Sequence, residues 1–199
     1  MVVTRGRPRS ASSSEAIDAA CIRLLTAGEA LTIRAVADAA GVGAATIYRR
    51  YPSREILLTE TIIRLMERSI PALLDVPIEQ GVLALTRGWV HAIVATPVGK
   101  ALPAIVELAS RDERVAQAVA DWHTDRRLRV NAMLQRAMDA GELRPDIDLG
   151  IAVDLLGGPT FYRRFFVSLD IESPDYADRL AREFLRWAGW TGSSLGSPS

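Results

Sequence analysis

The chain has 199 residues, of which 49% are hydrophobic, so it is long and apolar enough to bury a sizeable core. Its 24 basic and 24 acidic residues cancel, and its single cysteine, Cys21, excludes an internal disulfide. No apolar run approaches the roughly 20 residues of a membrane-spanning helix, and the basic, serine-rich N-terminus lacks the apolar segment of a signal peptide. We therefore expect a cytoplasmic chain with no membrane partner.

The basic residues are unevenly distributed, although the net charge is zero. Residues 1–55 hold eight arginines against five acidic residues, and the rest of the chain carries the matching acidic excess. Because Gly6 and Pro8 disfavour a stable helix, we expect a flexible basic arm over residues 1–11, suited to the minor groove of DNA. A merely solubilising tail is the alternative. The arginines of this arm are Arg5, Arg7 and Arg9.

The first predicted helix covers residues 13–27, after a serine-rich start. Its apolar positions include Ile17, Cys21 and Leu24, and Gly28 ends it. On this apolar face, Cys21 is expected to be a buried small side chain rather than a reactive thiol.

Residues 32–54 predict two short helices joined by a tight turn. Thr32 is a candidate N-cap for the first, and Gly41 fits the left-handed position that ends it. The second helix is expected to begin at Gly43 or Ala44, and Pro52 ends it because the residue before a proline avoids the helical conformation.

The second of these helices has two different faces. Ile47 and Tyr51, four residues apart, are expected to be buried, whereas Ala45, Tyr48 and Arg49 face away from them. Two helices with a glycine turn between them are typical of the helix-turn-helix, whose second helix enters the major groove of DNA.

This stretch resembles the DNA-binding domain of the TetR family of bacterial transcriptional repressors. Four positions depart from the residues usual in that family, namely Gly43, Ala45, Tyr51 and Arg54. The resemblance implies a repressor that binds a near-palindromic operator as a homodimer and responds to a small molecule. The residues that carry it are Thr32-Ile33-Arg34, Val36-Ala37, Ala40-Gly41-Val42, Thr46-Ile47-Tyr48 and the run from Tyr51 to Arg54.

The side chains expected at double-stranded DNA fall into two groups. Arg49 is the candidate for reading guanine, and Ala44 and Ala45 could meet thymine methyl groups. For every residue, a solvated or core position is the alternative. Contacts to the phosphates or elsewhere along the duplex are expected from Thr32, Arg34, Thr46, Tyr48, Arg50 and Arg54.

The rest of the chain also predicts helices and no strands, so the expected fold class is all-α. The helix 148–169 is expected to be interrupted at Gly157-Gly158-Pro159, with a kink or a close approach of another helix. The other predicted helices cover 53–70, 78–95, 100–110 and 112–140, and a last one starts at Ser173 or Pro174. The expected organisation is a basic arm (1–11), a helix-turn-helix domain (12–55), a helical effector-binding and dimerisation domain (56–190) and a disordered tail (191–199).

The two predicted helices nearest the C-terminus carry more aromatic surface than a monomer easily hides. The family resemblance implies that they form a four-helix interface with a second copy of the chain; ordinary core is the alternative. The residues expected there are Leu155, Phe161, Tyr162, Phe165, Phe166, Leu180, Phe184 and Trp187.

The resemblance also implies a small, mostly apolar effector within the helices that follow the DNA-binding domain. Bulky or adaptable side chains with a few polar tips could line such a pocket, although each could equally fill core. The candidates are Trp89, His91, Trp122, His123, Met133 and Phe161.

No motif points to catalysis. His91 and His123 lack the spacing of metal ligands, and no nucleophile elbow, phosphate-binding loop or dinucleotide-binding glycine pattern occurs. We expect no enzyme activity, no metal and no cofactor. A helical scaffold that happens to contain a helix-turn-helix is the alternative from a different class. Sequence- and salt-dependent duplex binding would separate the two, because a scaffold should show neither.

Overall fold

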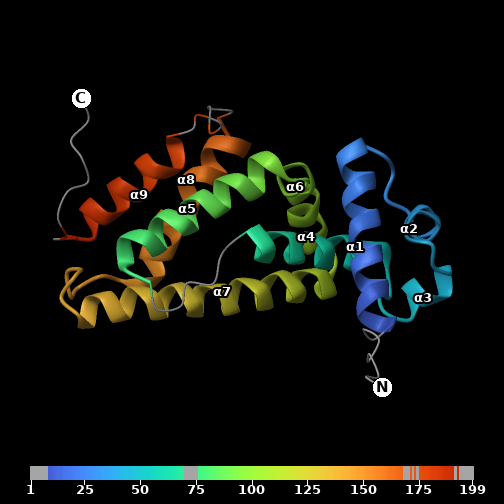
Figure 1. Ribbon diagram of the computed structural model, residues 1–199, viewed down its shortest axis with the longest axis horizontal. Coiled ribbons are helices and arrows are strands. Elements are labelled where there is room, and N and C mark those ends of the chain that lie inside the picture. Colours follow the sequence, from blue (N-terminus) through green and yellow to red (C-terminus); the bar gives the residue numbers. More distant parts are fainter. Residues whose placement is uncertain are drawn as a thin grey trace, which may run out of the picture. The chain divides into compact units, whose positions relative to one another are not determined.

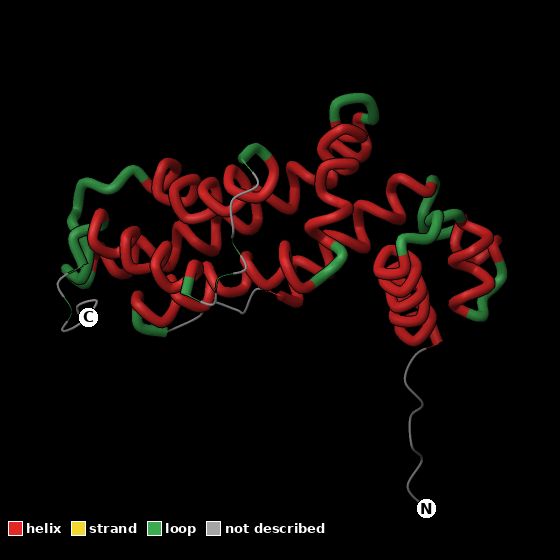
Figure 2. The backbone as a smooth tube through the Cα atoms, turned by 90° about the horizontal axis from the view of Figure 1, so that it is seen from above, coloured by secondary structure: helices red, strands yellow, loops and turns green. Residues whose placement is uncertain are grey.

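The computed structural model describes residues 9–69, 76–167, 171, 173, 175–190 and 192. Within these residues every regular element is a helix, which confirms the all-α prediction (Figure 2). Arg5, Arg7 and the predicted tail 191–199, Gly192 apart, lie outside the described residues. In chain order (Figure 1), the helices are α1 Arg9–Ala27, α2 Ile33–Ala40, α3 Ala44–Tyr48, α4 Arg54–Ser69, α5 Ile78–Ala95, α6 Val98–Ala109, α7 Glu113–Asp139, α8 Leu149–Phe165 and α9 Tyr176–Trp187.

The chain divides into two compact units. Unit 1 comprises Met1–Arg64 and Pro97–Val119, and unit 2 comprises Leu65–Thr96 and Ala120–Ser199. Helices α4 and α7 therefore contribute residues to both units. In the described part of the chain, no single helix is long and apolar enough to cross a membrane, although the bent pair α5 and α6 together has the length and composition.

In unit 1, α1 begins earlier than the sequence pattern predicts. The helix starts at Arg9 rather than at residue 13, so Arg9 belongs to a helix and not to an extended arm. Pro8, just before the first turn, is compatible with a helix start because the first helical N–H groups have no partner within the helix. Ile17, Cys21 and Leu24 are buried as expected, and α1 packs on α2.

A buried ion pair ties α1 to α4 in unit 1. The Arg64 guanidinium donates to both oxygens of Asp18, at 2.8 to 3.1 Å, and Asp18 is 2% exposed. Arg64 also donates to Glu60 and to the Tyr51 hydroxyl, both within 3.2 Å. Burial opposes the charge of Arg64, but the hydrogen bonds to Asp18 and Glu60 outweigh it and raise the pKa of Arg64. This network fixes the chain directly after α3, because Tyr51 is one of its members.

In unit 2, helices α5, α8 and α9 lie side by side (Figure 1). Their shared core includes Val82, Leu85, Leu156 and Leu185, and the second half of α7 adds Leu134. The residues recur three or four apart in each helix, which puts them on one apolar face. A smaller cluster joins Ile93 to Ile171 and Tyr176, with Phe161 and Leu180 packed against it.

Helix α8 runs without interruption through Gly157-Gly158-Pro159, contrary to the break expected from the sequence. The expected close approach does occur: a Cβ atom on Gly157 would lie 2.4 Å from the Trp89 ring of α5. Gly157 therefore provides the space in which the Trp89 ring lies against α8. Next to it, a Cβ on Gly158 would meet nothing within 4 Å.

Candidate DNA-binding face and ligand pocket

Helix α3 is short and is held by its buried side. Gly43 precedes it with φ −71° and ψ 142° and makes no side-chain cap. Ile47 and Tyr51 are fully buried, as predicted. Before α3, Thr32 caps α2 by accepting a hydrogen bond from the Ala35 N–H at 3.1 Å, and Gly41 ends α2 with φ 65°. The turn geometry predicted for a helix-turn-helix is thus present.

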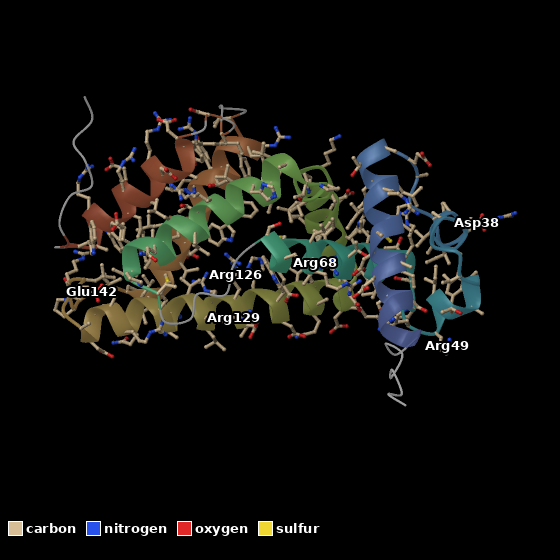
Figure 3. All side chains as sticks on the ribbon, viewed as in Figure 1. Asp38, Arg49, Arg68, Arg126, Arg129 and Glu142 are labelled. Atoms are coloured by element: carbon tan, nitrogen blue, oxygen red, sulfur yellow. The ribbon has the colours of Figure 1, made fainter. Side chains whose placement is uncertain are left out.

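The outward side of α3 is open to solvent. Tyr48 is 57% exposed, and Thr46 is half-buried. Figure 3 labels Arg49 at the end of this helix, where it is exposed. The other candidates from the sequence that are exposed are Thr32, Arg34, Ala44, Ala45, Arg50 and Arg54.

The charged groups near α3 differ in whether they have partners. Arg54 pairs with Glu55 at 3.2 Å, and Ser53 caps α4 by accepting from the Ile56 N–H at 3.2 Å. Arg34 and Arg49 have no ion-pair partner among the described residues. Thr32 uses its oxygen as the cap acceptor, so its hydroxyl hydrogen is still available to a phosphate. The arrangement offers free positive charge and hydroxyl donors on exposed residues of α2, α3 and their caps.

Unit 2 contains a pocket of about 280 Å³. It includes four of the six residues expected to line an effector site: Trp89, Trp122, His123 and Phe161. Its full lining consists of Met66, Trp89, Trp122, His123, Arg126, Arg127, Val153, Asp154, Gly157, Gly158 and Phe161.

The other two expected pocket residues lie elsewhere. His91 is on the exposed side of α5. Met133 is 2% exposed in the core of unit 2, and its Sδ atom lies 2.5 Å from where a Cβ on Gly81 would be. Met133 therefore fills space beside a glycine of α5 and does not line the pocket.

The charged part of this pocket, Arg126, was not among the residues predicted from the sequence. Arg126 follows Trp122 by four residues, so the two share a face of α7, and this spacing is a signal that could have found it. The Arg126 guanidinium carbon lies 4.5 Å from the Trp89 ring centre and 5.7 Å from that of Trp122. Figure 3 shows Arg126 between α7 and α5.

Of the two arginines that line the pocket, Arg127 has an ion-pair partner, whereas none occurs for Arg126 among the described residues. Arg127 donates to Asp154 at 2.6 Å and to the Gly150 carbonyl at 2.9 Å. Burial, reinforced by Arg126 and Arg127, lowers the pKa of His123, which favours its neutral form. Burial and the nearby Arg129 lower the pKa of Arg126 to about 9, so this guanidinium is still a cation at neutral pH.

A third feature is an apolar stripe on α8 that faces solvent. Ile151, Leu155, Tyr162 and Phe166 are 53%, 40%, 56% and 80% exposed. The rings of Tyr162 and Phe166 stack with their centres 6.2 Å apart. Large exposed apolar patches are unusual on monomers and are typical of interfaces.

Beside this stripe, a groove runs between α8 and α9. It is lined by Leu155, Pro159, Leu180, Glu183, Phe184 and Trp187. Of the other residues expected at a dimer interface, Phe161 and Phe165 are half-buried. Phe184 is 4% exposed and belongs to the core of unit 2, although it also borders the groove.

The described residues contain no group of three or more metal-ligating side chains. The exposed face of α3, the pocket of unit 2 and the α8 stripe are features with which the chain could recognise other molecules.

Comparison with known proteins agrees with this set of features. A family model described as "Tetracyclin repressor-like, C-terminal domain" matches residues 78–184, and one described as "Bacterial regulatory proteins, tetR family" matches residues 23–61. The uncharacterized HTH-type transcriptional regulator YdeS of Bacillus subtilis is 25% identical over 183 residues, which cover 90% of this chain and 92% of YdeS.

Solved structures show the same relationship. The TetR family transcription regulator SCO0332 is 26% identical, with a TM-score of 0.72 over 88% of this chain and 97% of that chain. The regulator FadR of Bacillus subtilis, solved in complex with stearoyl-CoA, has a TM-score of 0.65 over 88% of this chain and 97% of its own. FadR is only 14% identical, so this likeness concerns the fold alone. The family match over residues 78–184 spans more than half of the chain, and the chain belongs to the TetR family of DNA-binding transcriptional regulators, which are not enzymes.

Proposed function

We propose that this chain is a cytoplasmic, ligand-responsive repressor that binds a near-palindromic operator as a homodimer. The observation that carries the proposal is the exposed side of α3, where Tyr48 and Arg49 face solvent above buried Ile47. The repressor role is supported by the likeness of residues 78–184 to the C-terminal domain of the tetracycline repressor.

In this proposal, α3 enters the major groove and Arg49 reads a base. A free guanidinium can make two parallel hydrogen bonds to O6 and N7 of guanine, and Arg49 has no competing partner among the described residues. The hydroxyl groups of Tyr48 and Thr46 donate hydrogen bonds to phosphates. These contacts position the helix on the duplex without reading its sequence. Ala44 and Ala45 leave room for thymine methyl groups. The DNA phosphate backbone is bound by Thr32, Arg34, Arg50 and Arg54. In this proposal Arg5, Arg7 and Arg9 add positive charge that attracts the DNA phosphates.

The homodimer is supported by the α8 stripe and the groove beside it. Phe166 exposes 80% of its surface and Tyr162 exposes 56%, which costs free energy in water unless a partner covers them. A two-fold interface places each patch against the same patch of the other copy, and it gives the operator its two-fold symmetry.

The ligand response is supported by the pocket of unit 2. Its volume of about 280 Å³ and its aromatic lining suit a small molecule. In this proposal the effector favours a conformation that binds DNA poorly, and α4, which has residues in both units, carries the change. An effector can act only through a difference in its affinity for the two conformations. A coupling of about 1–3 kcal/mol would lower operator affinity roughly 5- to 150-fold.

The test is operator binding by variants of the outward side of α3. Replacing Arg49 with alanine should cost about 1–3 kcal/mol on the preferred operator and relax the preference at one base pair. Replacing Tyr48 with phenylalanine should weaken binding to all duplexes with little change in preference. Affinities would be measured by fluorescence anisotropy on the operator and on duplexes with single base changes.

Arg129→Ala serves as the matched control, because Arg129 is exposed on α7 and pairs with Asp125. Operator affinities of Arg49→Ala and Tyr48→Phe equal to those of the control and the wild type would show that α3 does not read the DNA.

A further inference from the structure

The pocket of unit 2 contains one positive charge that the protein itself does not neutralise. The Nε and one terminal nitrogen of Arg126 are buried and have no hydrogen-bond partner among the described residues. No ion pair of Arg126 occurs in the same part of the chain. Buried charged groups are normally paired, since leaving water is costly for an ion.

The neighbouring charges cannot supply the missing partner. Asp154, the acidic residue of the pocket lining, is engaged by Arg127 at 2.6 Å. Arg129 is a like charge and pairs with Asp125 on its own helix. His123 adds no negative charge in either protonation state. The pocket therefore has a net charge of about one positive unit at neutral pH.

The aromatic contacts of Arg126 compensate only part of this cost. The guanidinium lies over the Trp89 ring at 4.5 Å, an attraction that holds it in place without offering a hydrogen-bond acceptor. Nε and one terminal nitrogen on the same guanidinium carry N–H donors that no acceptor among the described residues uses. A planar acceptor with two oxygens matches such a pair of donors by forming two parallel hydrogen bonds.

Much of the remaining lining is apolar and leaves space for a flat group. Trp122 and Phe161 contribute rings, Val153 contributes an aliphatic side chain, and Gly158 has no side chain and leaves open space. A ligand with one anionic end and one apolar body could therefore satisfy both parts of the pocket.

We infer that the effector of this regulator is a small organic carboxylate with a flat apolar body, and that Arg126 binds its carboxylate. This inference deepens the proposed ligand response and rests on it. It adds a specific charge to the small, mostly apolar effector expected from the sequence. A single unpaired guanidinium matches a monoanion better than the dianion of a phosphate monoester, whose second charge would have no partner.

The test compares four probes that share one ring system and differ in charge: 2-naphthoate, the neutral 2-naphthamide, the cationic 2-naphthamidine and 2-naphthyl phosphate. Binding to the full chain, without DNA, would be measured by isothermal titration calorimetry. We expect the carboxylate to bind about ten- to a hundredfold more tightly than the amide, the difference typical of a charge-assisted hydrogen bond. The cation should bind least.

Three variants locate the charge. Arg126→Gln should bind 2-naphthoate no more tightly than 2-naphthamide. Arg126→Lys should recover part of the difference in affinity between the two probes. Arg129→Gln removes a nearby exposed arginine of the same helix that does not line the pocket, and it should bind like the wild type. Circular dichroism would establish that each variant is folded.

Each contrary result has a definite meaning. Equal affinity for carboxylate and amide, an unchanged carboxylate affinity in Arg126→Gln, or no binding of any probe at millimolar concentration would overturn the inference. Tighter binding of the phosphate would overturn the assignment to carboxylates. Binding of the carboxylate that leaves operator affinity unchanged would instead contradict the proposed ligand response, and the assignment of the pocket would stand.

Discussion

At the scale of single residues, the buried side chains of Ile47 and Tyr51 determine which residues of α3 face solvent. Ile47 and Tyr51 are both at most 1% exposed, and they fix the rotation of a helix of only five residues. Such a short helix would not be stable alone, so packing rather than propensity determines which residues face solvent. The exposure of Tyr48 and Arg49 is a direct consequence.

Cys21 gives a residue-scale prediction that concerns pH. Burial raises the pKa of the Cys21 thiol from its ordinary 9.0 to about 11, with Asp18 adding to the shift. The folded state therefore disfavours the thiolate, and the unfolded chain releases this proton at lower pH. The free energy of unfolding should fall as the pH rises from about 9 to about 11.

The thiolate is the reactive form, so the native chain at pH 8 should react with a disulfide reagent far more slowly than the chain in urea. Absorbance of the released thiolate measures both rates, and Cys21→Ala gives the background because Cys21 is the only cysteine. Equal rates for the native and unfolded chain would refute the burial of this thiol.

At the scale of elements, the contact between α5 and α8 means that a side chain is tolerated at Gly158 but not at Gly157. Gly157→Ala would place a methyl group within 2.4 Å of the Trp89 ring and should lower the free energy of unfolding by about 1–3 kcal/mol. In Gly158→Ala the added methyl group would lie in open space. This variant should raise the free energy of unfolding by about 0.5–1 kcal/mol, since alanine favours a helix.

Urea unfolding followed by circular dichroism would give both values, with each alanine serving as the control for the other. Similar changes in the two variants would contradict the packing of Trp89 against Gly157.

The sequence predicted elements better than the contacts between them. Local signals were sufficient where the cause is local: the Thr32 cap, the Gly41 turn and the limits of α5 agree with the pattern. The continuity of α8 through Pro159 could not be predicted, because it depends on packing that compensates for a lost hydrogen bond. The start of α1 at Arg9 likewise overrides the weak helix preference of the segment.

The same limit applies to the pocket. The search for bulky or adaptable side chains identified four residues of the pocket lining, yet the same criterion selected Met133, which is core. The Trp122–Arg126 spacing could have placed Arg126 at the pocket. That Arg126 has no ion-pair partner could not be predicted, because the pairing of Arg127 with Asp154 joins residues far apart in the sequence.

At the scale of the whole molecule, the α8 stripe predicts a dimer in solution. Replacing both Tyr162 and Phe166 with glutamate puts charge on exposed positions, so each chain should fold but the dimer should dissociate. Size-exclusion chromatography with light scattering would report the mass. Phe184→Glu is the contrasting variant: it buries a charge in the core and should unfold unit 2. A wild-type mass of one chain at micromolar concentration would contradict the dimer.

Selection of binding sites from random duplex DNA with the full chain would show whether a dimer reads DNA through α3. A dimer that presents one α3 from each copy should enrich a near-palindrome whose two half-sites are related by two-fold symmetry. The same selection with Arg49→Ala should lose the preference at one base pair of each half-site. Enrichment of no sequence, or of a single site without symmetry, would contradict operator binding by a two-fold dimer.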